Sequence, residues 1–175
     1  KKVNTMSESI IGLKRSSMCA DLSEADVGKK VTLMGWCHKC RDLGGLTFIT
    51  LRDRTGEIQL VITPESSEEI RTKAASVRSE YVLAAVGDVQ LRSAPNDKMK
   101  TGKIEIAVED LRIISESETP PFYIEEDDTA NEQLRLKYRY LDLRRPNMQR
   151  NLMLRHKIAK CARDYYDEQG FVEIE

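Results

Sequence analysis

Two adjacent strand patterns, residues 48–52 and 57–62, constrain the fold more than any other feature of this sequence. Aliphatic residues alternate with other residues in each pattern, and turn residues separate the two. Because successive side chains of a strand point to opposite faces, one face of this hairpin is aliphatic and the other carries Phe48, Arg52 and Gln59. A ring beside a guanidinium and an amide suits stacking on a nucleic-acid base and hydrogen bonding to its edge. The same pattern also fits a Phe48 packed under a loop and a solvated Arg52.

Further patterns place this hairpin in a larger, mainly β sheet. The sequence predicts three more strands and one helix, over residues 30–41, 81–93 and 103–115 and, for the helix, from Ser66 or Ser67 to about Glu80. Gly35 interrupts the first strand and indicates a bulge or a sharp coil, and Gly87 indicates a bend in the fourth. Three strands, a helix and two strands is the order of the five-stranded oligonucleotide/oligosaccharide-binding (OB) barrel. Its second and third strands form the binding face of that fold, and the hairpin occupies them.

Composition bounds the class of protein. A chain of 175 residues with 40% hydrophobic and 33% charged residues is typical of a soluble globular protein, with room for one domain and part of another. No apolar run is long enough for a membrane span, so we expect no membrane association. Residues 1–15 carry no signal-peptide core, and we expect them to be an N-terminal extension.

The charges are unevenly placed. The net charge of −1 does not indicate a nucleic-acid binder. However, an acidic stretch over residues 116–132 is followed by a basic one over residues 135–150. Acidic runs are usually solvated linkers, so only the basic stretch is a candidate phosphate contact.

The cysteine spacing does not complete a metal site. Cys37 and Cys40 form a CxxC, but no second CxxC or HxxxH pair accompanies it, and a strand would point these two thiols to opposite faces. Together with Cys19 and Cys161 they are expected to be reduced thiols, without a bound metal. Reduced thiols fit a cytoplasmic protein best.

The C-terminal part has a different pattern. Residues 116–131 resemble a linker, and Pro146 can begin a helix whose apolar stripe runs to Gln169, with Gly170 at its end. Residues 171–175 then begin a strand pattern. A long amphipathic helix with one unpaired strand cannot bury its own apolar face. We therefore expect a truncated α+β domain that needs another subunit or further residues.

The segments RDLGGLTFITLRDRTGEIQLV, TGKIEI and RLKYRYLDLRRP resemble aspartyl-tRNA synthetases of the bacterial and organellar type. The resemblance runs from about Met18 to Glu175. It implies an anticodon-binding OB domain over residues 16–115, a linker and hinge over 116–145, and the start of a class II catalytic domain over 146–175. GFVEIE would begin the first class II motif, which in the family contributes to a dimer interface.

The resemblance also implies roles for individual residues. Arg41 and Gln59 match positions that hydrogen-bond the central anticodon base, and Phe48 matches the aromatic that stacks on it. Leu43 occupies a position that varies with discrimination between aspartate and asparagine tRNAs. The positions near the other anticodon bases are those of Arg92, Asn96 and Glu105, and the hinge residues that could contact phosphate or tie domains together are Arg139, Arg144 and Arg145.

The implied function is tRNA anticodon recognition by part of an aspartate–tRNA ligase. The parent enzyme would use ATP and Mg²⁺, form a homodimer and bind the tRNA for aspartate, while this chain would hold no catalytic residue and would itself be inactive. A freestanding OB module for single-stranded nucleic acid is the alternative reading, and a purely structural barrel is a third. The hinge sequence and GFVEIE favour the first, because a freestanding module has no use for them.

Overall fold

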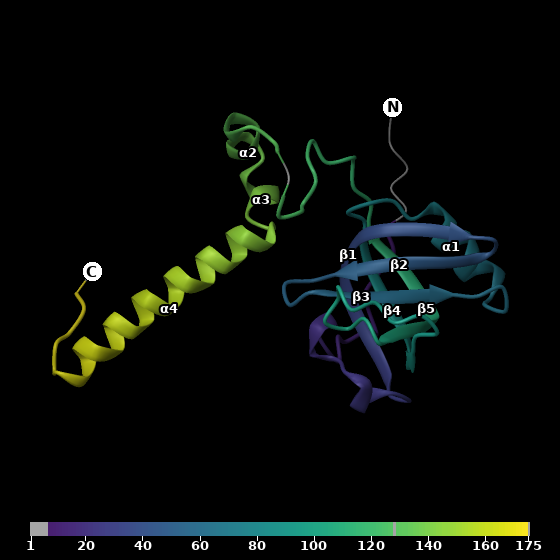
Figure 1. Ribbon diagram of the computed structural model, residues 1–175, viewed down its shortest axis with the longest axis horizontal. Coiled ribbons are helices and arrows are strands. Elements are labelled where there is room, and N and C mark those ends of the chain that lie inside the picture. Colours follow the sequence, from purple (N-terminus) through teal and green to yellow (C-terminus); the bar gives the residue numbers. More distant parts are fainter. Residues whose placement is uncertain (1–6, 128, 175) are drawn as a thin grey trace. The chain divides into compact units, whose positions relative to one another are not determined.

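The computed structural model describes residues 7–127 and 129–174, and the chain divides into two compact units, Lys1–Thr119 and Pro120–Glu175. The first unit is a closed five-stranded barrel in the order β1-β2-β3-β5-β4 (Figure 1). The strands are β1 (Lys30–Leu43), β2 (Leu46–Arg52), β3 (Glu57–Ile62), β4 (Val82–Leu91) and β5 (Ile104–Ser115). All neighbours are antiparallel except β3 and β5, which close the barrel in parallel. The predicted OB barrel is confirmed.

The barrel core follows the predicted alternation. Ile49 and Leu51 of β2 and Ile58 and Leu60 of β3 are fully buried, while Phe48 is only half-buried. Period-2 burial continues on the other strands, because each strand presents every second side chain to the barrel interior. The other fully enclosed large side chains are Leu33, Ile62, Val77, Leu83, Val89, Ile104, Ile106 and Leu111.

The two strand glycines play different parts. The register of β4 against β5 shifts between Val86 and Gly87, so the bend predicted at Gly87 is confirmed. Of the two alternatives at Gly35, the bulge is wrong, because the register of β1 against β2 shifts between Cys37 and Lys39 instead, and the sharp coil stays a prediction. Gly35 permits a close approach of the backbones, since an added Cβ would lie 2.4 Å from the Arg52 carbonyl oxygen.

Helix α1 (Glu68–Ser76) lies between β3 and β4, as predicted. Ser67 caps it, its Oγ accepting a hydrogen bond from the Ile70 amide at 3.3 Å. The predicted end near Glu80 is wrong, because the chain turns extended at Val77, whose side chain enters the core. Glu80 then has a φ of 67°, and its amide donates to the Cys37 carbonyl at 2.6 Å. Residues 77–81 therefore pack against β1 rather than extend the helix.

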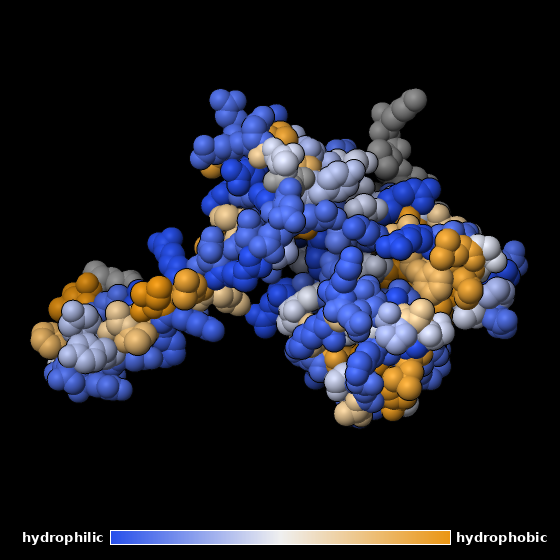
Figure 2. Space-filling model, viewed as in Figure 1, coloured by the Kyte–Doolittle hydropathy of each residue, from blue (hydrophilic) through white to orange (hydrophobic). Residues whose placement is uncertain are grey.

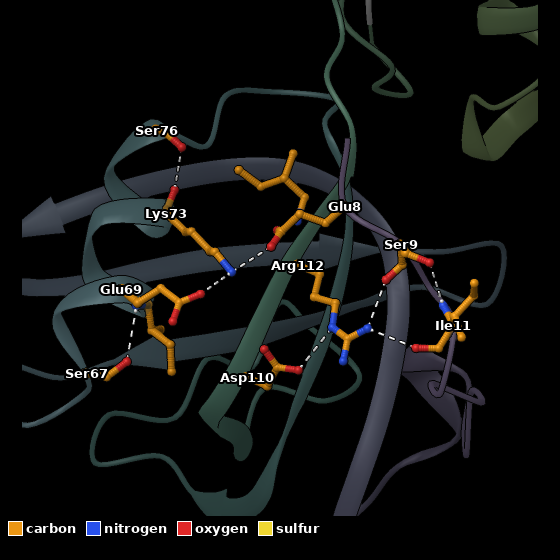
Figure 3. Close-up of polar contacts among 11 residues, drawn as sticks. Glu8, Ser9, Ile11, Ser67, Glu69, Lys73, Ser76, Asp110 and Arg112 are labelled. Atoms are coloured by element: carbon orange, nitrogen blue, oxygen red, sulfur yellow. Dashed lines mark hydrogen bonds and ion pairs between the residues drawn. The ribbon is translucent and has the colours of Figure 1, made fainter. Parts of the chain in front are cut away.

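The segment before β1 is attached to the barrel (Figure 3). It includes two short 3₁₀ turns, Cys19–Asp21 and Glu24–Asp26. Lys73 of α1 lies 2.7 Å from the Glu8 carboxylate, and Arg112 of β5 donates to the Ser9 carbonyl at 2.9 Å. The described part of the predicted extension, residues 7–15, is thus held by both α1 and β5.

The second unit contains α2 (Glu132–Lys137), α3 (Arg139–Asp142) and α4 (Pro146–Glu168). Phe122, Ile124 and Leu141 form its small buried cluster. Pro146 is the first residue of α4 and Gly170 follows its end with a φ of 82°, as predicted. The predicted strand is wrong over residues 171–174, which have no strand partner, and residue 175 lies outside the described residues. Helices α2 and α3 were not predicted, because segments this short show no helical period.

Helix α4 has no buried residue, and apolar side chains lie at its surface, where Figure 2 shows orange areas along it. Its exposed large apolar residues are Leu152, Met153, Leu154, Ile158, Tyr165 and Tyr166. Charged residues lie between these groups of apolar residues. No helix of the described chain is long and apolar enough to cross a membrane.

Candidate nucleic-acid interface

One pocket of the barrel gathers all the predicted RNA-binding residues except Asn96. It has a volume of about 210 Å³ and lies across β1, β2, β3 and β5 and the chain that follows β4. Its lining residues are Arg41, Leu43, Phe48, Thr50, Gln59, Arg92, Ser93, Ala94 and Glu105. The pocket therefore combines one aromatic ring, one amide, one carboxylate and two guanidinium groups on the outer face of the barrel.

Phe48 owes its place to strand parity and pairing. Its neighbours Thr47 and Ile49 point inward and are buried, so the ring points to the outer face. It pairs with Arg41 of β1 on one side and with Val61 of β3 on the other. A half-buried ring with a cationic side chain across the strand is a suitable platform for a stacked base.

Glu105 provides the acidic wall of the pocket. Only 7% of its surface is exposed, although it lies on the outer face of β5. One carboxylate oxygen accepts a hydrogen bond from Gln59 Nε2 at 2.7 Å, and the other accepts from Gln90 Nε2 at 2.9 Å. These contacts fix the carboxylate and settle which end of the Gln59 amide is the donor.

Two arginines supply positive charge. Arg41, near the end of β1, is exposed, whereas Arg92 is half-buried just after β4. The Arg92 Nη1 atom is enclosed and has no hydrogen-bond partner within residues 7–127 and 129–174. A buried donor without an acceptor is costly. An acceptor atom on a ligand in this pocket would remove that cost.

The structure places Asn96 outside the pocket lining. Its Oδ1 accepts a hydrogen bond from the Lys98 amide at 3.1 Å, and its own amide donates to the Gly102 carbonyl at 2.9 Å. The approach is tight, since a Cβ on Gly102 would lie 1.8 Å from the Asn96 carbonyl oxygen. Asn96 therefore shapes the loop between β4 and β5.

Arg52 does not belong to this surface, and its assignment to an exposed polar face is wrong. Its side chain is paired with the Glu80 carboxylate at 2.6 Å, and the two residues are 8% and 5% exposed. Strand parity does place Arg52 on the outer face, but the segment after α1 covers that end of β2. Because this segment was predicted to be helical, the sequence did not reveal the pair.

Thr50 and Gln90 are site residues that the sequence reasoning missed. Thr50 lies between Phe48 and Arg52 on the same strand face, so parity alone could have identified it. Gln90 does not line the pocket, and its contact with Glu105 depends on the register of β4 against β5. No pattern within either strand predicts the register of β4 against β5.

Comparison with known proteins shows what the two units are similar to. Residues 31–114 match the model described as an OB-fold nucleic acid binding domain, and residues 131–175 match tRNA synthetases class II (D, K and N). The aspartate–tRNA ligase of Ruminiclostridium cellulolyticum is 62% identical over 172 residues, which cover 97% of this chain. Over nearly its whole length, the chain is similar to aspartyl-tRNA synthetases. The ligase of Clostridium kluyveri is 55% identical over 170 residues.

The chain spans 29% of the length of these aspartyl-tRNA synthetases. Among solved structures, the asparaginyl-tRNA synthetase of Pyrococcus horikoshii complexed with asparaginyl-adenylate is 27% identical, with a TM-score of 0.79 over 93% of this chain and 36% of its own. A putative aspartyl-tRNA synthetase from Leishmania major shares the fold, with a TM-score of 0.83 at 22% identity over 97% of this chain and 35% of its own. The resemblance expected from the sequence is confirmed.

The three candidate hinge arginines differ in exposure. Arg145 is 3% exposed and donates to the carbonyl oxygens of Glu125 at 2.9 Å and Glu126 at 2.7 Å. Arg139 is half-exposed and lies 2.6 Å from the fully buried Asp142, while Arg144 is half-buried. The Arg145 guanidinium also lies 3.4 Å from the Asp142 carboxylate, so its described partners belong to the second unit.

The thiols show no metal-binding arrangement. In the described part of the chain, no group of three or more His, Cys, Asp or Glu side chains is placed to hold a metal ion. Cys37 is fully buried, and its burial raises its pKa to about 12. Burial likewise raises the pKa of Cys40. Thiols that stay protonated are poor metal ligands and poor nucleophiles.

Proposed function

We propose that this chain binds the anticodon loop of the tRNA for aspartate and that Arg41, Phe48 and Gln59 read its central base. One observation carries the proposal: a half-buried aromatic platform, an oriented amide and a guanidinium share one pocket of an OB barrel. Sequence-specific RNA recognition usually targets unstacked loop bases, which are held by stacking and by hydrogen bonds to their edges.

The chemistry of the pocket suits uracil, the central base of the aspartate anticodon. Uracil presents one imino donor between two carbonyl acceptors. Because Gln59 Nε2 donates to Glu105, Gln59 Oε1 is the atom that accepts from the imino group. Arg41 donates to a carbonyl of the base or to a neighbouring phosphate. Phe48 stacks on the ring.

Glu105 suits guanine, the first base of the same anticodon. An ionised carboxylate only accepts hydrogen bonds, and the Watson–Crick edge of guanine presents an imino and an amino donor side by side. Arg92, with its enclosed Nη1, is proposed to bond to a base or phosphate of the remaining anticodon position. Leu43, 64% exposed beside the pocket, is proposed to affect discrimination between aspartate and asparagine tRNAs.

The parent protein is proposed to be a cytoplasmic, homodimeric aspartate–tRNA ligase that uses ATP and Mg²⁺. The match of residues 131–175 to the class II synthetases supports this reading over a freestanding OB module, for which that segment has no purpose. We propose domain bounds at residues 16–115, 116–145 and 146–175. This chain alone is expected to form no aspartyl-adenylate, and ATP–pyrophosphate exchange that depends on aspartate would contradict that expectation.

The experiment that tests the proposal compares two RNA hairpins. One carries the aspartate anticodon stem–loop, and the other differs only in its central base. We expect the chain to bind the first more tightly by about 1–3 kcal/mol, because a wrong edge leaves buried polar groups unpaired. Equal affinity at one stated salt concentration would refute recognition of the central base.

Replacing Gln59 by alanine should weaken binding of the cognate hairpin by about 1–2 kcal/mol. The hairpin with the altered central base should lose less, because it already leaves the Gln59 oxygen unpaired and loses only the support that Gln59 gives to Glu105. Titrations of both hairpins against both proteins measure the difference. Gln133→Ala, in α2, is a control of the same chemistry on an exposed surface. A loss that is equal for the two hairpins would contradict the assignment.

We propose that Arg145 ties its own unit together and that Arg41 contacts the ligand. Arg145→Ala should therefore leave the slope of log affinity against log salt concentration unchanged. Arg41→Ala should reduce that slope by about one if its partner is a phosphate, since one fewer counterion is then released. Fluorescence titrations at several salt concentrations measure both slopes. A reduced slope for Arg145→Ala would assign that residue to the RNA instead.

A further inference from the structure

We infer that Gln90, which does not line the pocket, is a positioning residue that sets how the pocket discriminates the base facing Glu105. The inference rests on the proposed function and adds a residue to it. Gln90 acts through Glu105, whose carboxylate it holds together with Gln59.

The strand register brings these three residues into one row. Gln59 of β3 is paired with Glu105 of β5 across the parallel closure, and Glu105 is paired with Gln90 of β4 on its other side. The two amide nitrogens lie 2.7 Å and 2.9 Å from different oxygens of the same carboxylate. One donor on each oxygen fixes both the position and the plane of the carboxylate.

Both partners of this carboxylate are neutral. An arginine or lysine bonded directly to the carboxylate would also hold it, but the ion pair would occupy the oxygens and weaken the charge offered to a ligand. Amide donors hold the group in place and leave its charge for the ligand. A fixed carboxylate of this kind accepts two N–H groups side by side, as guanine offers, and is repelled by the ring-nitrogen acceptor that adenine presents at the same position.

The carboxylate also sets the orientation of its other partner. Gln59 can present either its oxygen or its nitrogen to a base, and the bond from its Nε2 to Glu105 selects the oxygen. If Glu105 turned away, the Gln59 amide would be free to rotate. Gln90 therefore affects two residues, Glu105 and Gln59, that are proposed to contact adjacent bases. It lies at one end of the row and does not line the pocket.

The test compares binding of two hairpins, the aspartate anticodon stem–loop and the same loop with adenine in place of the first guanine. For the original chain we expect a preference for guanine on the order of 10- to 100-fold. Gln90→Met keeps the length of the side chain and removes its donor. It should reduce the preference to a few-fold at most, mainly by weakening binding of the guanine hairpin.

A second substitution separates positioning from stability. Glu105→Gln should reduce the guanine preference to the same extent, and adding Gln90→Met to it should change the preference no further, because no carboxylate remains to be positioned. Asp88→Asn is the matched control, since Asp88 lies two residues from Gln90 on the same face of β4 and does not line the pocket. It should leave the preference unchanged.

The inference is overturned if Gln90→Met binds both hairpins more weakly by the same factor, or if its effect adds to that of Glu105→Gln. Should Gln90→Met fail to fold, Gln90→Asn retains an amide but withdraws it by one methylene, and the same reduction is expected. If Gln90→Met keeps the full guanine preference while the central-base preference also persists, the inference fails and the proposed function stands. If the chain without substitutions shows no central-base preference, the proposed function is refuted instead.

Discussion

Replacing Phe48 by alanine is expected to weaken binding of the aspartate anticodon hairpin by about 1–3 kcal/mol, because the stacking platform is lost. The loss should be the same for hairpins with other central bases, since every base has a face on which a ring can stack. Titrations with the two hairpins used to test the central base measure this directly. A uniform loss here, beside a base-dependent loss for Gln59→Ala, would assign the two side chains to different parts of the recognition.

The stability of the same variant provides the control. A fully buried phenylalanine replaced by alanine costs about 3–5 kcal/mol of unfolding free energy, and half-buried Phe48 should cost clearly less. Phe122→Ala is the matched comparison, because Phe122 is 6% exposed and belongs to the cluster of the second unit. It should disturb packing there without changing the central-base preference. A large fall in melting temperature for Phe48→Ala, with unchanged affinity of the folded fraction, would mean that the ring is a core residue.

Replacing Glu80 by alanine is expected to lower the unfolding free energy of the barrel by about 3–5 kcal/mol, because it leaves the Arg52 guanidinium buried without its carboxylate. The two groups lie 2.6 Å apart and are almost wholly enclosed. Denaturant unfolding followed by the fluorescence of Trp36, the single tryptophan, measures the change. The folded fraction should keep the central-base preference, since Arg52 lies outside the pocket lining.

Glu109→Ala is the matched control for that prediction. Its carboxylate pairs with Lys30, but both side chains are largely exposed, so water replaces the lost partner. Unfolding should be almost unchanged in this variant. If Glu80→Ala were equally harmless, the buried pair would contribute nothing to the barrel, and residues 77–81 would owe their position to Val77 and to the backbone hydrogen bond from Glu80 to Cys37.

Much of the barrel could be predicted, because the patterns that specify its strands and turns lie within short segments of the sequence. Alternation with period two identified the buried faces of β2 and β3, and with them the outer positions of Phe48 and Gln59. Turn residues and the helix between the third and fourth strands then gave the order of elements. The candidate binding face was placed from that order, since the OB barrel binds at its second and third strands.

What escaped prediction depends on contacts between distant residues. The end of α1 is set by the core position of Val77 and by the pairing of Glu80 with Arg52. The contact of Gln90 with Glu105 follows from a register that no local pattern encodes. The strand expected after Gly170 failed for a related reason, because a strand forms only beside a partner and the second unit offers none among its described residues.

The parallel closure of β3 on β5 has a consequence for the order of folding. Gln59 and Glu105 are 46 residues apart in the chain, and the two strands share only a short run of paired residues. A contact of such separation forms late, after the local hairpins have reduced the entropy of loop closure. During synthesis, the hairpin with Phe48 would leave the ribosome well before β5. We expect the nascent chain to gain base discrimination abruptly, when the segment that carries Glu105 becomes available, rather than strand by strand.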